Sequence, residues 1–152
     1  MSNSDYRRDA RALALQVLYE VDCTRHPVET VWRERLTQDS LRPETVMLAR
    51  RLVEGVLAYK PRLDVLIQRY APEWPLEQIA IVDRNILRMA IYEMMLEESV
   101  PLKVAINEAI GLAKMFGSES APRFVNGVLG TLAEHADEVQ AVLDTAAPTR
   151  LT

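Results

Sequence analysis

The chain has 152 residues, of which 49% are hydrophobic, and its net charge is −4 at neutral pH. This length can enclose one continuous core, so we expect a single domain over residues 1–152. No apolar run approaches the roughly 20 residues of a membrane span, and the polar start MSNSDYRRDA lacks the apolar segment of a secretory signal, so we expect a cytoplasmic protein without membrane contact.

The spacing of apolar residues predicts an all-α fold. They recur at intervals of three and four, and no stretch alternates with the period of two that a half-buried strand would show. Prolines fall between these periodic stretches and divide the chain into a compact bundle of about seven helices. The predicted helical segments are residues 5–24, 28–37, 44–59, 62–70, 76–96, 103–116, 119 or 122 to 135, and 136–145.

The first of these segments has a clear core stripe and a basic outer side. Its apolar stripe consists of Ala10, Leu13, Ala14, Val17 and Val21. At 100° per residue, Arg7 and Arg11 lie beside one edge of this stripe, and Arg8 and Tyr19 lie farther round on the same solvent side. Guanidinium groups that share a surface with an aromatic ring suit single-stranded RNA, although a solvated helix face would show the same spacing.

The segment 76–96 is apolar nearly all round, which predicts a central helix. Its apolar residues leave only a narrow polar strip around Arg84 and Arg88. Glu93 lies among them, so we expect it to pair inside the protein or to accept backbone amides. Asp83 and Arg84 are expected to be exposed at the helix start, or to take part in a simple intramolecular ion pair.

The turn GSESAPR, residues 117–123, combines small hydroxyl side chains with one arginine between two phenylalanines. Ser118, Ser120 and the first amides of the following helix could bond phosphate or a base, with Phe116 or Phe124 as a stacking platform. The alternative is that Ser118 caps the helix and both phenylalanines belong to the core. Arg123 adds positive charge.

Four glycines near the carboxyl end need an explanation, since glycine weakens a helix. For Gly111, Gly127 and Gly130 we expect close approach of two helix backbones, in preference to direct contact with a ligand. Gly117 follows a helix end and suits a left-handed cap.

The sequence favours no enzyme class. It lacks a phosphate-binding glycine loop, a dinucleotide fingerprint and a nucleophile elbow. One cysteine and two histidines provide no zinc spacing. We therefore expect no catalytic residues, no metal and no cofactor.

Three separated stretches resemble the NusB family of transcription antitermination factors. They are RRDARALALQVLYE (residues 7–20), VDRNILRMAIYEM (82–94) and KVAINEAIGLAKMFGSESAPRFVNGVLG (103–130). The resemblance implies a helical RNA-binding adaptor that recognises boxA RNA of ribosomal RNA operons together with the ribosomal protein NusE. It would help to assemble the antitermination complex on elongating RNA polymerase.

The resemblance also implies site residues. In the family, the arginine-rich start of the first helix and a tyrosine matching Tyr19 bind boxA RNA, and Tyr70 matches another aromatic position near that surface. The region of Asp83 and Arg84 matches a part of the NusE contact. Some relatives carry an acidic residue where Ser120 stands, and its absence should favour RNA here.

Two other interpretations remain open at this stage. The chain could be a protein-binding helical module, such as a homodimer that hides the basic helix, as some family members self-associate. It could also be a truncated RNA-binding domain of a ribosomal RNA cytosine methyltransferase, whose amino-terminal domain resembles this family. The sequence reveals neither the preferred nucleotides, the affinity, the binding order of RNA and NusE, nor the operons regulated.

Overall fold

The computed structural model describes residues 3–38 and 40–145, which form seven α-helices, one short 3-10 helix and no strand. This confirms the all-α prediction. The elements are α1 (Asn3–Thr24), α2 (Val28–Gln38), α3 (Pro43–Tyr70), η1 (Leu76–Gln78), α4 (Ile81–Leu96), α5 (Leu102–Phe116), α6 (Ala121–Ala133) and α7 (Ala136–Asp144). Within these ranges no helix is both long and apolar enough to cross a bilayer.

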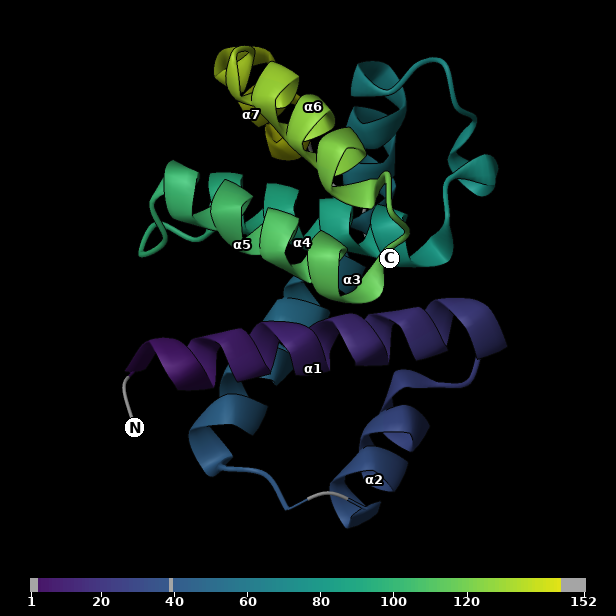
Figure 1. The fold of residues 1–152 in the computed structure, drawn as a ribbon, viewed down its shortest axis with the longest axis vertical. Helices are drawn as coiled ribbons and strands as arrows, with labels where there is room; N and C mark the ends of the chain where they lie inside the picture. Colours follow the sequence, from purple (N-terminus) through teal and green to yellow (C-terminus); the bar gives the residue numbers. More distant parts are fainter. Residues whose placement is uncertain (1–2, 39, 146–152) are drawn as a thin grey trace.

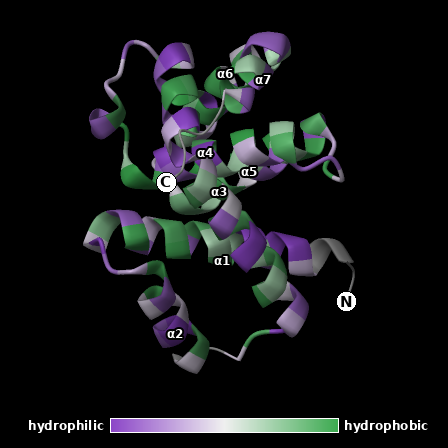
Figure 2. Ribbon diagram, turned by 180° about the vertical axis from the view of Figure 1, so that it is seen from behind, coloured by the Kyte–Doolittle hydropathy of each residue, from purple (hydrophilic) through white to green (hydrophobic). Residues whose placement is uncertain are grey.

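The helices pack around α3 and α4. Figure 1 shows α1 lying across the molecule, with α2 on one side of it and α4 to α7 on the other, while α3 passes behind α1 and joins the two sides. Figure 2, seen from behind, shows hydrophobic segments turned toward the region where α3, α4 and α5 meet. Ile86, Leu87 and Ile91 of α4 are completely buried there. The prediction of a central helix is therefore confirmed.

The prediction of two helices separated at Pro61 is wrong, because α3 runs without interruption from Pro43 to Tyr70 with Pro61 inside it. A proline inside a helix removes one hydrogen bond and costs about 3 kcal/mol. Here Pro61 is exposed, so water can reach the carbonyl that loses its partner. The same buried stripe continues on both sides of it, from Val56 to Leu63, and its burial outweighs the lost bond.

The segment 76–96 is not one helix. The 3-10 turn η1 ends at Gln78, the backbone is extended at Ile79 (φ −75, ψ 132), and α4 starts at Ile81. Ile79 is buried, and the extended backbone lets its side chain reach the core although it does not continue the helical turn of α4. The Leu76 carbonyl accepts from the Ile79 amide at 3.1 Å and from Arg84 Nη1 at 3.1 Å, so Arg84 ties η1 to α4.

The predicted close approach at three glycines and the left-handed cap at Gly117 were wrong. A Cβ at Gly111, Gly127 or Gly130 would meet nothing within 4 Å, so these positions are not helix contacts. The close approach occurs instead at Gly55 of α3, where an added Cβ would collide with the ring of Tyr92 from α4. No described glycine has a positive φ, so Gly117 is not a left-handed cap.

A buried polar network joins α1, α3 and α4. Arg88 is only 3% exposed, and its Nε donates to Asp64 Oδ1 at 2.7 Å while its Nη1 donates to Asp22 Oδ2 at 3.0 Å. Asn85 and Arg84 also donate to Asp22. Burial opposes the ionisation of Asp22, but the bonds from Arg88 and Asn85 outweigh it and lower its pKa below the ordinary value. The predicted polar strip around Arg84 and Arg88 therefore lies inside the protein, where its hydrogen bonds hold α1, α3 and α4 together.

Candidate nucleic-acid interface

The start of α1 carries two exposed arginines. Arg8 has a side chain that is 69% exposed, and its Nε lies 3.3 Å from Glu108 Oε2 on α5. Arg7 is also exposed, and its guanidinium carbon lies 5.8 Å from the centre of the Tyr6 ring. An exposed ion pair such as that of Arg8 is weak in water, so both arginines keep most of their capacity to bind phosphate.

The placement of Arg11 on the solvent side was wrong. Its side chain is 7% exposed, and its Nε donates to Glu93 Oε1 at 2.9 Å while its Nη2 donates to Glu93 Oε2 at 3.1 Å. Arg11 Nη1 also lies 3.7 Å from Glu108 Oε1. The prediction that Glu93 pairs internally is confirmed. Arg11 therefore ties α1 to α4, and its guanidinium is not available as an independent RNA contact.

These arginines border a groove between α1, α3 and the connection from α4 to α5. Its far wall was missed by the sequence reasoning, because nothing in the sequence indicates that α3 and this connection meet the start of α1. On that wall Arg51 Nη2 lies 2.8 Å from Glu97 Oε2. The groove is lined by Tyr6, Arg7, Arg8, Arg11, Leu48, Arg51, Leu52, Glu93, Glu97, Ser99, Val100, Pro101, Val104 and Glu108.

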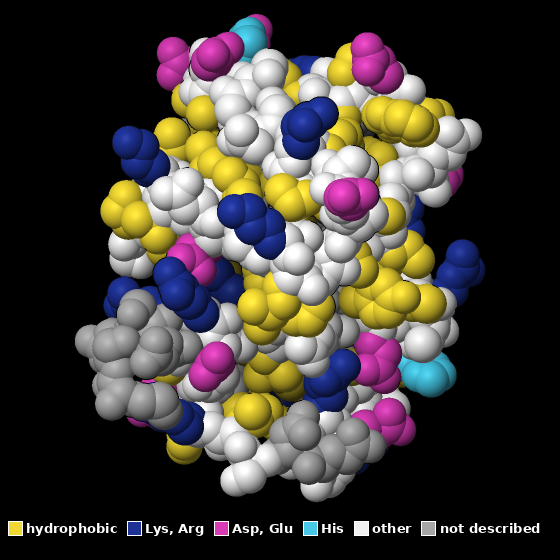
Figure 3. Space-filling model, viewed as in Figure 1, with side chains coloured by type: hydrophobic (Ala, Val, Ile, Leu, Met, Phe, Trp, Pro, Cys, Tyr) yellow, Lys and Arg dark blue, Asp and Glu magenta, His cyan; other side chains and the backbone are white. Residues whose placement is uncertain are grey.

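Tyr19 lies on the same side of α1 as Arg8. The two residues are eleven positions apart, close to three full turns, and Arg8 reaches α5. Tyr19 is 40% exposed and Phe116, the last residue of α5, is 36% exposed. Figure 3 shows this face in the orientation of Figure 1: lysine and arginine side chains stand among apolar patches, and acidic side chains gather at the end formed by α7.

The turn between α5 and α6 presents small polar groups. Ser118 and Ser120 are exposed, and their hydroxyl oxygens lie 3.4 Å apart. Ser120, not Ser118, is the N-cap of α6, and it makes no side-chain cap bond. Together with the exposed Arg123 these serines border a shallow open depression, which leaves their hydroxyls free to meet a ligand.

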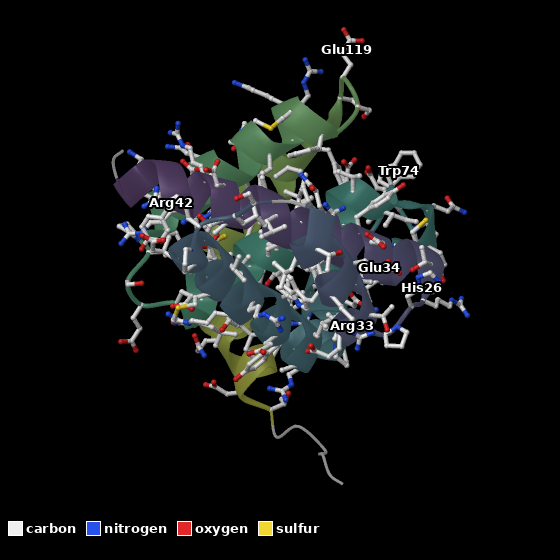
Figure 4. All side chains as sticks on the ribbon, turned by 90° about the horizontal axis from the view of Figure 1, so that it is seen from below. His26, Arg33, Glu34, Arg42, Trp74 and Glu119 are labelled. Carbon is white, nitrogen blue, oxygen red and sulfur yellow. The ribbon has the colours of Figure 1, made fainter. Side chains whose placement is uncertain are left out.

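A second groove lies between the α3–α4 connection, α4 and α6, and we call it the Trp74 groove. It is lined by Trp74, Gln78, Ile79, Ala80, Asp83, Ser120 and Phe124. Trp74 is 51% exposed, and Figure 4 shows it projecting from the same side of the molecule as Glu119 of the turn. Phe124 is half-buried, so one part of its ring packs on the core and another lines this groove. The sequence analysis missed Trp74, although an aromatic residue bracketed by prolines is a signal for an exposed anchor.

The prediction that Asp83 is exposed was wrong. The alternative, an intramolecular ion pair, holds for Arg84, which pairs with Asp22, and not for Asp83 among the described residues. Asp83 is 7% exposed, and its Oδ1 is buried without a hydrogen-bond partner among the described residues. Burial raises the pKa of the Asp83 carboxyl above its ordinary value. Arg84 is turned away toward Asp22 Oδ2, at 3.4 Å, and the Leu76 carbonyl.

Tyr70 is not brought together with the arginines. Its hydroxyl donates to Glu138 Oε1 at 3.4 Å, and its ring centre lies 5.5 Å from that of His135. These partners belong to the α6–α7 end of the molecule, where acidic side chains repel phosphate.

In residues 3–38 and 40–145, no cluster of three or more His, Cys, Asp or Glu side chains is arranged to hold a metal ion. Cys23 is exposed and unpaired.

Comparison with known proteins gives consistent matches over most of the chain. The sequence model of the NusB family matches residues 8–134. The chain is 48% identical over 128 residues to the transcription antitermination protein NusB of Roseiflexus castenholzii, and the aligned stretch covers 83% of this chain and 90% of that protein. It is 45% identical over 140 residues to that of Dehalococcoides mccartyi, covering 92% and 94%.

Solved structures share the fold. The NusB structure from T. maritima superposes with a TM-score of 0.77 at 34% identity, covering 88% of this chain and 95% of that one. A protein in a solved complex of the antitermination factors NusB and NusE with double-stranded RNA gives a TM-score of 0.77 at 24% identity, covering 86% and 98%. At that identity the second likeness concerns the fold alone.

Proposed function

The chain belongs to the NusB family, and from this premise we propose that it is a transcription antitermination factor that binds boxA RNA together with NusE. In this role it holds the leader RNA of ribosomal RNA operons on the elongating polymerase. The role needs binding and assembly only, and no catalytic step. Curated relatives at 44 to 48% identity carry the antitermination name, which supports the proposal.

We propose that RNA follows the face formed by α1, the end of α5 and the turn after it. The observation that carries this assignment is that the exposed Arg8 shares a side of α1 with Tyr19 and contacts Glu108 of α5. Arginine binds phosphate oxygens in a planar fork, and an exposed ring offers a base a stacking surface. Phe116 and the turn residues Ser118, Ser120 and Arg123 extend this surface.

Within this proposal, Arg11 and Tyr70 have other roles. Arg11 supports the RNA face from beneath by fixing α1 to α4. Tyr70 lies beside Glu138, so it is left out of the RNA surface. The Trp74 groove, with Asp83 on its floor, is the proposed position of NusE.

An RNA titration tests the proposal. A short boxA-like RNA and a scrambled control are titrated with the protein alone and with NusE, at two salt concentrations. We expect preference for the boxA-like RNA, and a logarithmic salt slope of about −2 if Arg7, Arg8 and Arg123 make the phosphate contacts. Equal affinity for both RNAs, with and without NusE, would instead favour the protein-binding module.

Paired variants locate the RNA surface. Arg7→Ala combined with Arg8→Ala should weaken RNA binding and make the salt slope shallower, because two counterion-releasing contacts are lost. The matched control is Arg33→Ala on α2, an exposed arginine that faces the viewer in Figure 4, far from the turn that carries Glu119. If the control weakens binding as much as the double variant, charge alone and not this face is responsible.

A further inference from the structure

Asp83 stands out among the buried charged side chains. Arg11, Arg88 and Glu93 are also buried, and each of them is paired by hydrogen bonds to an opposite charge. Asp83 Oδ1 has no donor among the described residues. A buried acceptor without a donor is costly in a folded protein. Asp83 lies in the first turn of α4, and we therefore ask whether its carboxyl gains a hydrogen bond when the protein binds a partner.

The turn after α5 rests directly on this carboxyl. A Cβ added to Gly117 would lie 3.1 Å from Asp83 Oδ1, 2.9 Å from the Ala113 carbonyl oxygen and 2.6 Å from Ala121 Cβ. The last distance is shorter than real Cβ contacts allow. Only glycine therefore lets the turn approach the carboxyl this closely, and this contact, rather than a positive φ, explains Gly117.

The same turn holds donors that lack acceptors. The amide of Gly117 donates to the Ala113 carbonyl at 2.9 Å, and the amide of Ala121 donates to the Ser118 carbonyl at 3.0 Å. Between them, in the described structure, the amides of residues 118–120 make no hydrogen bond. A buried acceptor without a protein partner thus lies beneath a turn whose three exposed amides have no acceptor within the described protein.

Asp83 also faces the Trp74 groove, together with Trp74, Phe124 and Ser120. Ser120 belongs both to this groove and to the depression of the turn. A polypeptide that fills the groove therefore touches the side chain on which the turn rests. The groove and the turn share one buried group.

We infer that Asp83 is a positioning residue that couples the two sites: when a partner polypeptide fills the Trp74 groove, the carboxyl is fixed and accepts an amide hydrogen bond from the turn at Ser118. The turn is then held in the form that binds RNA. This inference rests on the proposed function, since it takes NusE as the occupant of the groove and RNA as the ligand of the turn. It adds the route by which one binding event promotes the other.

The test compares RNA affinity with and without saturating NusE in three proteins. Coupling between two sites is typically 5- to 150-fold in affinity. We expect a ratio of about tenfold for the unaltered chain and below about twofold for Asp83→Leu, which keeps a similar side-chain size but has no hydrogen-bond acceptor. Glu77→Gln removes a negative charge from an exposed position on η1, outside the groove, and should retain the full ratio.

A second measurement follows the turn itself. Amide hydrogen exchange at Ser118 should slow when NusE binds the unaltered chain, and should not change in Asp83→Leu. A tenfold ratio in Asp83→Leu, or equal protection of Ser118 in both proteins, would overturn the inference while leaving the proposed function intact. Absence of specific RNA binding by the unaltered chain with NusE would refute the proposed function itself, and the inference with it.

Discussion

The buried pair of Arg11 and Glu93 gives the sharpest test of how α1 is built. Replacing Arg11 with Met keeps much of the aliphatic length but leaves the Glu93 carboxylate, 6% exposed, without its main partner. Removal of one member of a buried pair costs about 3 to 5 kcal/mol, because the other charge stays desolvated. Glu108 cannot compensate, since it is itself a carboxylate.

This loss is large but should not unfold the protein, since domains of this kind have free energies of unfolding of about 5 to 15 kcal/mol. For a chain of this length it corresponds to a fall in Tm of roughly 6 to 20 °C. Urea titration followed by circular dichroism measures the free energy directly. The matched control is Arg8→Met, which should cost less than about 1 kcal/mol because Arg8 is mostly solvated.

RNA titrations of the same two variants distinguish a residue that stabilises α1 from a residue that contacts RNA directly. At a temperature where both are folded, Arg8→Met should weaken RNA binding, and Arg11→Met should weaken it less. Adding Glu93→Leu to Arg11→Met should restore much of the lost stability, since it removes the orphaned charge. The reasoning fails if Arg11→Met is as stable as the unaltered chain and loses as much RNA affinity as Arg8→Met.

Two further predictions concern the interior. The pKa of Asp22 is lowered, so its ionised form stabilises the fold above its unfolded-state pKa, and that contribution disappears as the pH falls through the lower folded-state value. Asp22→Asn should therefore reduce stability at pH 7 and bring it closer to the unaltered chain in strong acid, as pH-dependent urea titrations would show; an equal loss at both pH values would count against it. Gly111→Ala should raise the free energy of unfolding by about 0.5 to 1 kcal/mol, because the position is open, whereas Gly55→Ala should lower it by displacing Tyr92. Thermal denaturation distinguishes the two, and stabilisation by both would contradict the packing described.

The helices were predictable because their apolar periodicity is a local property of the sequence. The errors arose where the outcome depended on partners distant in the chain. A helical wheel places Arg11 at the edge of a stripe, but only the fold shows that Glu93, 82 positions later, lies opposite it. Proline at 61 is a local breaking signal, and burial of α3 on both sides overrode it.

The candidate site was predictable in part for the same reason. The exposed arginines and the turn after α5 follow from helix phase and residue type. The groove wall at Arg51 and the buried carboxyl of Asp83 depend on how α3, α4 and α6 meet. Trp74 carried a usable signal in its proline-bracketed loop, and it was not interpreted as a surface anchor.

Arg8 and Arg11 are separated by less than one turn of α1, yet replacement by lysine has different structural consequences at the two positions. At position 8 the side chain is mostly solvated, so lysine keeps the positive charge and costs the fold little. At position 11 the planar fork closes on both oxygens of Glu93, a geometry that an ammonium group cannot reproduce. Exchange of arginine for lysine therefore costs the fold little at the first position and breaks the two-point contact with Glu93 at the second.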